Sequence, residues 1–104
     1  MAEPTVTVLR VEHPVPDFAV WKREGFDRDP IGREQGGVRR YRVMRSTGAG
    51  GVVAAVELEF DGRREAEAFA VALRELWSRV HERFGWRELP DARLFEVADA
   101  GEYR

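Results

Sequence analysis

The sequence predicts an α+β fold in which two helices cover one face of a four-stranded antiparallel sheet. Two observations predict it. Segments rich in β-branched residues and segments with apolar residues at helical spacing follow the order strand, helix, strand, strand, helix, strand. The two middle strands are joined by a short glycine-rich turn, as in a hairpin. Two split βαβ units in this order form a ferredoxin-like βαββαβ arrangement.

The first strand and the first helix are predicted near the N-terminus. Thr5–His13 is rich in β-branched residues, and the Pro-Val-Pro stretch after it cannot supply ladder hydrogen bonds. Asp17 stands where an N-cap is expected, before the helix Phe18–Phe26. Gly25 disfavours the end of this helix by about 1 kcal/mol relative to alanine. We therefore expect a short helix.

The middle of the chain is predicted to form a hairpin. A polar loop, Asp27–Gly37, leads into the strand Gly37–Ser46, and a turn containing "GAGG" separates it from the strand Val52–Phe60. Because loops often carry binding residues, the long charged loop is either a lid over a site or a solvated connector.

Hairpin register decides where the arginines of the second strand point. If Thr47 pairs with Val52, Arg42 lies opposite Glu57 and Arg40 opposite Glu59, and each ion pair is worth about 0.2–1 kcal/mol. The other face then carries the pairs Val43 with Val56, Tyr41 with Leu58 and Arg39 with Phe60. A slip by one residue would oppose charged and apolar faces, which the pleat disfavours.

The second half of the chain is predicted to form a long helix and a last strand. Apolar residues recur at three- and four-residue steps over Arg63–Phe84 and mark one helix face: Ala66, Phe69, Ala70, Leu73, Trp77, Val80 and Phe84. Gly85 fits the position just past the helix end. Ala92–Val97 is the predicted fourth strand, so the single predicted domain has a core from about 5 to 97 and a polar tail over 98–104.

The ion-pair face of the sheet also carries apolar side chains. They are Met44, Val53, Ala55 and, from the first strand, Val6 and Val8. An apolar area of this size is rarely left bare in a monomer. We therefore expect a homodimer, with sheet packed against sheet.

Composition excludes several classes of function. The net charge of −2 gives no overall field that would attract nucleic acid or an anionic membrane. The chain has no cysteine, so disulfides, thiolate nucleophiles and thiolate-bound metals are excluded. No apolar run approaches the roughly 20 residues of a membrane span, and the N-terminus lacks the plan of a signal peptide, so we expect a cytoplasmic protein. No phosphate-binding glycine motif or nucleophile elbow is present.

The apolar face of the second strand carries unexpected polar groups. Arg39, Tyr41 and Arg45 are predicted to lie there, under the helices. A core-facing tyrosine needs a partner for its hydroxyl, and a core-facing arginine needs an anion, a carbonyl or a route to solvent. If the face is open, the arginines would favour a ligand carboxylate or phenolate. If it is closed, we expect them to pair with Glu34, Asp29 or a chain terminus, and Tyr41 only to pack.

The two histidines are the next candidates. His13 is the best general base by residue type, since an imidazole changes charge near neutral pH; a water-exposed histidine at a strand end is the alternative. His81 follows Trp77 by four residues, so both lie on one side of the long helix. Two histidines without a close histidine–carboxylate pattern do not predict a metal site.

The three tryptophans are large for so small a core. Trp77 fits the apolar face of the long helix and Trp21 can pack from the first helix. Trp86 follows the predicted helix end, so we expect it at a pocket mouth or at the dimer boundary.

Three stretches carry a resemblance to a known superfamily: "VLRVEHPVPDFAVWK", "DRDPIGREQGGVRRYRV" and "EAEAFAVALRELW". The chain, from Thr5 to about Val97, resembles the dimeric α+β barrel proteins, which include antibiotic-biosynthesis monooxygenase-like, polyketide-cyclase-like and haem-degrading members. The resemblance implies a homodimer in which two four-stranded sheets form a barrel, with a pocket between sheet and helices in each subunit. It also implies cofactor-free chemistry on phenolic or quinol-like substrates, using tryptophan, histidine, tyrosine or asparagine side chains.

The sequence departs from parts of that pattern. It contains no asparagine, which argues against an asparagine-dependent version of the chemistry. It has no haem-degradation signature, although His81 lies where a haem ligand would be considered, and we expect no cofactor and no metal.

Two hypotheses follow. The first is a homodimeric barrel that binds a small aromatic or acidic metabolite and, if it is an enzyme, acts as a cofactor-independent monooxygenase or cyclase. The expected catalytic residues are His13 as base with Tyr41 and Arg39 as polar anchors. The expected ligand-binding residues are Trp21, Arg45, Trp77, His81 and Trp86. The second hypothesis is a non-catalytic binding or partner module of the same fold, with its interior polar groups satisfied internally.

Overall fold

The computed structural model describes residues 6–86 and 88–104. The elements are β1 (Thr7–Val15), α1 (Phe18–Glu24), the 3₁₀ turn η1 (Phe26–Arg28), β2 (Val38–Arg45), β3 (Val52–Phe60), α2 (Arg63–Val80) and β4 (Asp91–Glu96). The predicted order of strands and helices is confirmed.

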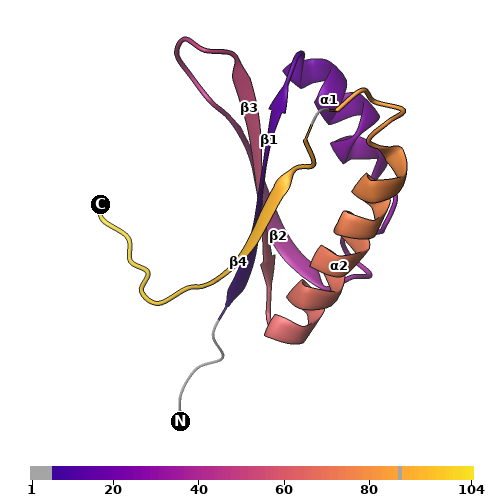
Figure 1. Ribbon diagram of the computed structural model, residues 1–104. Helices are drawn as coiled ribbons and strands as arrows, with labels where there is room; N and C mark the ends of the chain where they lie inside the picture. The colour runs from indigo at the N-terminus through magenta and orange to yellow at the C-terminus, as the bar shows by residue number, and fades with distance from the viewer. Residues whose placement is uncertain (1–5, 87) are drawn as a thin grey trace.

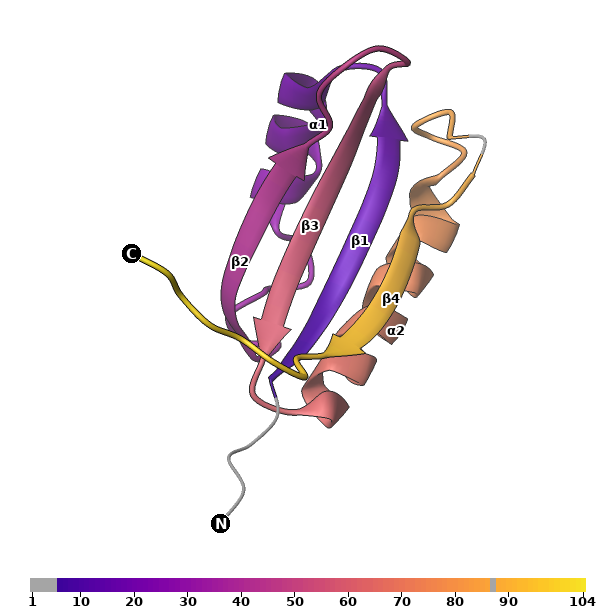
Figure 2. The same ribbon diagram turned by 90° about the vertical axis from the view of Figure 1, so that its left-hand side faces the viewer.

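The four strands form one antiparallel sheet in the order β2-β3-β1-β4. Both helices cover the same face of this sheet (Figure 1). No helix of the described residues lies on the opposite face (Figure 2). This is the predicted ferredoxin-like fold. We call the helix-covered face the inner face and the bare one the outer face.

The predicted hairpin register is confirmed over most of its length. Arg42 pairs with Glu57, Arg40 with Glu59 and Tyr41 with Leu58. A bulge between Val38 and Arg40 then shifts the register, so Val38 and not Arg39 lies opposite Phe60. The predicted pairing of Arg39 with Phe60 is therefore wrong, because a bulge leaves one residue of the strand without a cross-strand partner.

The core lies between the inner face and α2. Leu9 and Phe60 are fully buried in the sheet, and α2 contributes the side chains Ala66, Phe69, Ala70 and Trp77. The two alanines let the helix backbone approach the sheet closely, while Phe69 packs its ring 5.7 Å from that of Phe60. The predicted packing role of Trp77 agrees with its position in this core.

The first helix forms as predicted. Asp17 caps it, because its Oδ1 accepts a hydrogen bond from the backbone N–H of Val20 at 3.0 Å. The helix is seven residues long and ends before Gly25, whose N–H donates to the carbonyl of Trp21.

The first strand runs two residues past its predicted end at His13. β4 pairs with β1 only as far as Glu12, so at Pro14 the β4 side of the strand is an unpaired edge. Proline, which has no backbone N–H, is tolerated at such an edge.

The long helix ends four residues earlier than predicted, at Val80 rather than Phe84. The chain still turns helically until Gly85, which has a φ of 68°. Gly85 N–H then donates to the carbonyl of Glu82 (3.1 Å) and Trp86 N–H to that of His81 (3.0 Å). This pair of bonds is the Schellman arrangement, so the predicted place of Gly85 past the helical turns is confirmed. None of the described helices is long and apolar enough to cross a membrane.

Candidate functional site

One row of residues crosses the inner face near the end where β1 meets α1. Arg45 on β2 pairs with Ala54 on β3, and Ala54 pairs in turn with His13 on β1. Neighbouring strands lie about 4.8 Å apart, so roughly 10 Å separates the backbones of Arg45 and His13. Ala54 is 1% exposed and contributes only a methyl group between them. We call these three residues the His13 row.

His13 is buried, with 5% of its surface exposed. Its Nδ1 atom has no hydrogen-bond partner among the described residues. The ring meets Trp86 edge to face, with centroids 4.5 Å apart and an interplanar angle of 75°. The alternative of a water-exposed histidine is therefore wrong, because the turn at Gly85 brings Trp86 back against the strand end.

Burial lowers the pKa of His13 below its usual value of 6.5, and a backbone hydrogen bond at Glu88 acts in the opposite direction with smaller effect. The charged form of an imidazole is disfavoured where water is excluded. The ring is therefore neutral at pH 7. A neutral imidazole whose Nδ1 has no partner can accept a hydrogen bond or a proton from a molecule placed beside it.

Aromatic rings flank the other end of the row. The Arg45 guanidinium lies over the ring of Phe18, 5.5 Å from its centroid. Trp21 packs beside Phe18 at 5.6 Å and stacks on Phe26 at 6.1 Å. Arg45 is exposed, so the expectation that it lies under the helices is wrong, because β2 is an edge strand. Its predicted internal partners, Glu34 and Asp29, are not the groups it contacts.

The structure separates Tyr41 from the His13 row. Tyr41 is 52% exposed, and its ring packs against that of Phe26 with centroids 5.2 Å apart. Arg33 covers both rings, with its guanidinium 3.8 Å from the Phe26 centroid and 5.4 Å from that of Tyr41. The expectation that Tyr41 lies under the helices is wrong, because β2 is an edge strand and α2 packs over β1, β3 and β4.

Arg39 also lies away from the row. Its side chain is 67% exposed and pairs with Asp61 at 3.3 Å. The expected position of Arg39 on the inner face, and its expected partners there, are therefore wrong; the bulge is the physical reason.

The side chain of His81 turns toward its own helix, where Nδ1 lies 3.0 Å from the Ser78 carbonyl oxygen. The structure thus brings His13, Trp86 and Arg45 to one end of the inner face and leaves Tyr41, Arg39 and His81 apart from His13.

Arg33 was not anticipated from the sequence. Its guanidinium donates to the carbonyl of Phe26 at 2.8 Å, and its backbone N–H donates to Asp29 Oδ1 at 2.9 Å. These bonds fold the loop 27–37 back onto η1. An arginine in an irregular loop follows no periodic pattern, so the sequence carried no signal for this contact with Phe26, seven residues away.

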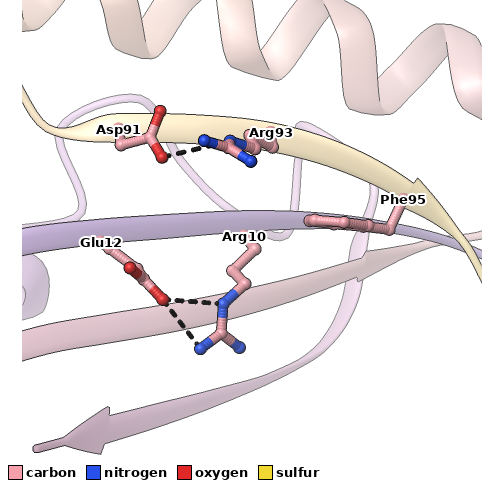
Figure 3. A pocket seen from close by; sticks show the side chains of 5 residues that line it. All are labelled: Arg10, Glu12, Asp91, Arg93 and Phe95. Carbon is pink, nitrogen blue, oxygen red and sulfur yellow. Dashed lines mark hydrogen bonds and ion pairs between the residues drawn. The ribbon is translucent and has the colours of Figure 1, made fainter.

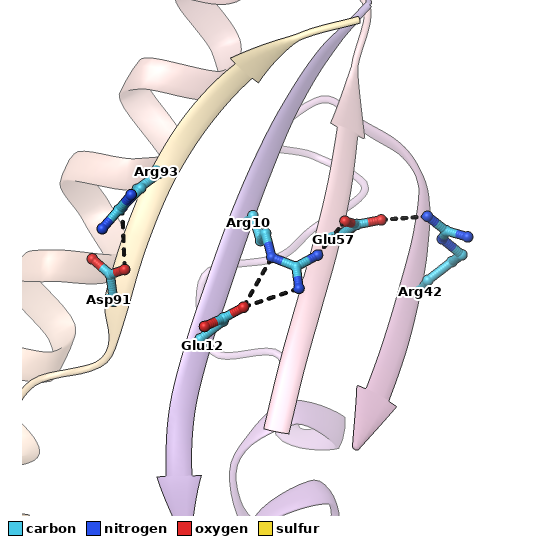
Figure 4. Close-up of polar contacts among 6 residues, drawn as sticks. All are labelled: Arg10, Glu12, Arg42, Glu57, Asp91 and Arg93. Carbon is cyan, nitrogen blue, oxygen red and sulfur yellow. Dashed lines mark hydrogen bonds and ion pairs between the residues drawn. The ribbon is translucent and has the colours of Figure 1, made fainter. Parts of the chain in front are cut away.

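The outer face carries a connected set of charges. Glu57 accepts hydrogen bonds from Arg10 on β1 and from Arg42 on β2 (Figure 4). Arg10 also binds Glu12, and Arg40 pairs with Glu59 at 3.6 Å. The predicted pairs of Arg42 and Arg40 are confirmed. Hydrogen bonds from Arg42 and Arg10 hold the pKa of Glu57 below its usual value despite partial burial.

Two hollows lie on this outer face. One, of about 170 Å³, is lined by Arg10, Glu12, Asp91, Arg93 and Phe95 (Figure 3). The other, of about 340 Å³, is lined by Val8, Arg10, Arg42, Glu57, Phe95 and Val97. Neither is lined by His13, Tyr41 or Arg39. Among the described residues, no group of three or more histidine, aspartate or glutamate side chains could hold a metal ion.

Comparison with known proteins identifies a shared fold. No protein-family model and no curated protein matches the chain. A solved structure described as a dimeric ferredoxin-like protein from an uncultured marine organism superposes with a TM-score of 0.66 at 14% identity, over 95% of this chain and 100% of that one. A protein of unknown function from Nitrosomonas europaea superposes with a TM-score of 0.62 at 14% identity, over 99% of both chains. At such identities the likeness is one of fold.

Proposed function

We propose that the chain is a homodimer that binds a small organic molecule at the His13 row, between the sheet and the helices. The observation that carries this proposal is the Nδ1 atom of His13, which is buried and unpartnered. Burying a polar atom without a hydrogen bond costs about 1–3 kcal/mol. Such a cost is typical of functional sites, where a ligand supplies the missing partner.

The chemistry of the row selects a class of ligand. His13 is a neutral acceptor for a hydroxyl group, Trp86 offers an aromatic wall, and Arg45 would pair with a carboxylate or phenolate. A phenolic or aromatic acid fits all three. If the protein is an enzyme, His13 would take the proton that a cofactor-independent monooxygenase or cyclase removes from its substrate. Tyr41 and Arg39 have no part in this proposal, because they lie apart from the row.

The outer face supports a second copy as the partner. Four arginines (Arg10, Arg40, Arg42 and Arg93) balance four acids (Glu12, Glu57, Glu59 and Asp91) in the ion pairs of this face. Across β1 and β4 like charges are neighbours: Arg10 pairs in register with Arg93, and Glu12 with Asp91. A two-fold axis between these rows would set the arginines of each copy on the acids of the other. The similar structure from the marine organism is itself described as dimeric.

Binding of two probes tests the ligand site. We expect 4-hydroxybenzoate and 1-naphthol both to bind, measured by calorimetry and by quenching of tryptophan emission. His13→Gln should weaken both probes at least tenfold, and Arg45→Gln should weaken only the acid. Arg39→Gln, on the same strand, is the matched control and should change neither.

Equal binding by the wild type and His13→Gln would refute the site, as would failure of both probes to bind at millimolar concentration. Light scattering tests the assembly separately. We expect twice the chain mass of 11.9 kDa, and a value of 11.9 kDa would refute the dimer.

A non-catalytic module is the second candidate, and one observation favours it: the two hollows lie on the outer face rather than beside His13. Oxygen uptake with 1,4-dihydroxynaphthalene distinguishes the two. Uptake above the uncatalysed rate that disappears in His13→Gln favours the enzyme. Binding without uptake favours the module.

A further inference from the structure

We infer that α1 is a lid over the His13 row, with hinges at Pro16 and Gly25, which opens to admit the ligand and closes over it. This inference rests on the proposed ligand site and adds the route by which a molecule reaches it.

The His13 row is closed to solvent at two of its three residues. His13 is 5% exposed and Ala54 1%. A molecule therefore reaches the unpartnered Nδ1 atom of His13 only if an element that covers the row moves away. On one side the ring of Trp86 lies against His13. On the other side α1 packs against β3, and its Phe18 ring meets the Arg45 guanidinium. Figure 1 shows α1 on the inner side, at the end of the sheet where β1 ends.

The first helix is held to the sheet more weakly than the second. None of the seven residues of α1 is buried. In α2 the buried residues are Ala66, Phe69, Ala70 and Trp77. Moving α2 would expose these core side chains, whereas every side chain of α1 is already partly in contact with water. An element with few buried apolar contacts can open locally while the rest of the protein stays folded. Of the two helices, α1 is therefore the one that can move.

The turn around Trp86 is a less suitable place for the opening. The N–H of Trp86 donates to the carbonyl of His81 at 3.0 Å, and this bond helps to terminate the helical turns that follow α2. The Trp86 ring also stacks on Phe84, with centroids 5.5 Å apart. Moving the ring away from His13 would disturb these contacts. By contrast, α1 can swing as a body and keep its own backbone hydrogen bonds.

The chain that follows Gly25 is anchored to the sheet. The ring of Phe26 in η1 packs 5.2 Å from that of Tyr41 on β2, and the Arg33 guanidinium covers it at 3.8 Å. Arg33 also donates to the carbonyl of Phe26 at 2.8 Å. The moving part therefore ends at Gly25, and it begins at Pro16, directly after β1. Residues at the ends of an element are the usual hinges of a lid.

Two ion pairs join α1 to η1 across Gly25. Lys22 Nζ lies 2.8 Å from Asp27 Oδ1, and Arg28 Nη2 lies 2.6 Å from Glu24 Oε2. We call them the latch pairs. Exposed ion pairs such as these contribute little to stability. The latch pairs therefore favour the closed position without locking the lid.

Amide hydrogen exchange tests whether α1 opens by itself. The reporters are the N–H groups of Trp21 and Gly25 in α1, and those of Phe69 and Ala70 in α2. We expect protection factors in α1 to be lower than those in α2 by roughly tenfold or more. They should also depend less on urea, because opening of α1 exposes less surface than unfolding does. Equal protection and equal urea dependence would overturn the lid, because α1 would then open only with the whole protein.

The effect of a ligand on the same amides distinguishes a lid from a frayed helix. With 1-naphthol at about twenty times its dissociation constant, protection in α1 should rise by about tenfold or more, because the ligand stabilises the closed state. Unchanged protection in α1, together with calorimetric binding that His13→Gln weakens, would overturn the lid and leave the ligand site standing. Failure of both 1-naphthol and 4-hydroxybenzoate to bind at millimolar concentration overturns the ligand site, and the lid with it.

The rate of ligand release tests the latch pairs. Asp27→Asn with Arg28→Gln removes both pairs, changes no residue of α1 and keeps the net charge. This variant should release 1-naphthol about two- to tenfold faster than the wild type in stopped-flow dilution, because its lid opens more often. The control is Arg63→Gln with Glu67→Gln, which removes an exposed ion pair within α2 and should release the probe at the wild-type rate. Equal rates in the latch variant and the control would overturn the lid.

Discussion

At the scale of single residues, His13 couples proton binding to folding. Its pKa is lowered in the folded protein, so between that lowered value and 6.5 the unfolded chain binds more protons. Stability from this group is complete above about pH 6.5 and is lost as the pH falls below it. We expect the free energy of unfolding in urea to drop between pH 7.5 and 5.5 in the wild type and to change less in His13→Gln.

The other histidine provides the control for this prediction. His81→Gln removes the second imidazole of the chain and is the matched control for the loss of a histidine. Parallel pH profiles for the wild type and His13→Gln would show that burial of the His13 ring does not determine this dependence.

Glu57 contributes to stability in a different pH range. Its pKa is lowered by Arg42 and Arg10, so its contribution is present above about 4.5 and is lost as the pH falls. Glu57→Gln should cost about 0.5–1 kcal/mol at pH 7, because a neutral amide replaces the partner of two arginines. Glu59→Gln, which loses one longer ion pair on the same strand, should cost less. If 1 M NaCl leaves the difference between the two variants unchanged, it does not arise from charge.

The chemistry that a side chain such as that of His13 can perform could be predicted from the sequence, but the groups that surround the side chain could not. The imidazole of His13 indicated a base from the sequence, yet its burial depends on Trp86, which lies far along the chain and returns only because the turn at Gly85 reverses direction. Tyr41 followed the inner-face alternation correctly, but its exposure depends on how far the helices extend across the sheet. Neither the burial of His13 nor the exposure of Tyr41 can be inferred from the local sequence pattern.

At the scale of elements, the hairpin register could be predicted because two requirements agree: opposite charges face each other on one side and apolar residues on the other. The bulge before Arg40 could not be predicted, since the alternation of polar and apolar residues does not reveal it. The end of α2 was misplaced for a related reason. Val80 and Phe84 continue the apolar spacing through a turn that is helical in shape but no longer part of the helix.

The turn at Gly85 predicts an effect on the site. Its φ of 68° suits glycine, and a side chain there would meet no neighbour, so any cost arises from backbone strain. Gly85→Ala should cost about 1 kcal/mol and shift tryptophan emission, because Trp86 would move relative to His13. Gly85→Asn should cost less, since asparagine tolerates this conformation, and Gly101→Ala, in open space, should have no effect. Unchanged emission in Gly85→Ala would mean that the turn does not position Trp86.

At the scale of the whole molecule, the exposed phenylalanine on the outer face lets us predict how the proposed dimer responds to a charge introduced there. Phe95 is 48% exposed and lines both hollows on that face. Phe95→Glu should convert the proposed dimer to monomer in light scattering, because an unpaired carboxylate would be buried between the sheets. Val71→Glu, at a similarly exposed position on α2, should leave the mass unchanged. A dimer that survives Phe95→Glu would place the interface elsewhere.

The central position of β1 has a consequence for how the protein is made. β1 leaves the ribosome before the other strands of the sheet, but one of its two partners is β4, which leaves after the other three. The sheet therefore cannot be completed until β4 has been synthesised, and closing so distant a pair is slow. Until then one edge of β1 stays open to other nascent chains. A ribosome that stalls before Asp91 would leave this strand in need of a chaperone.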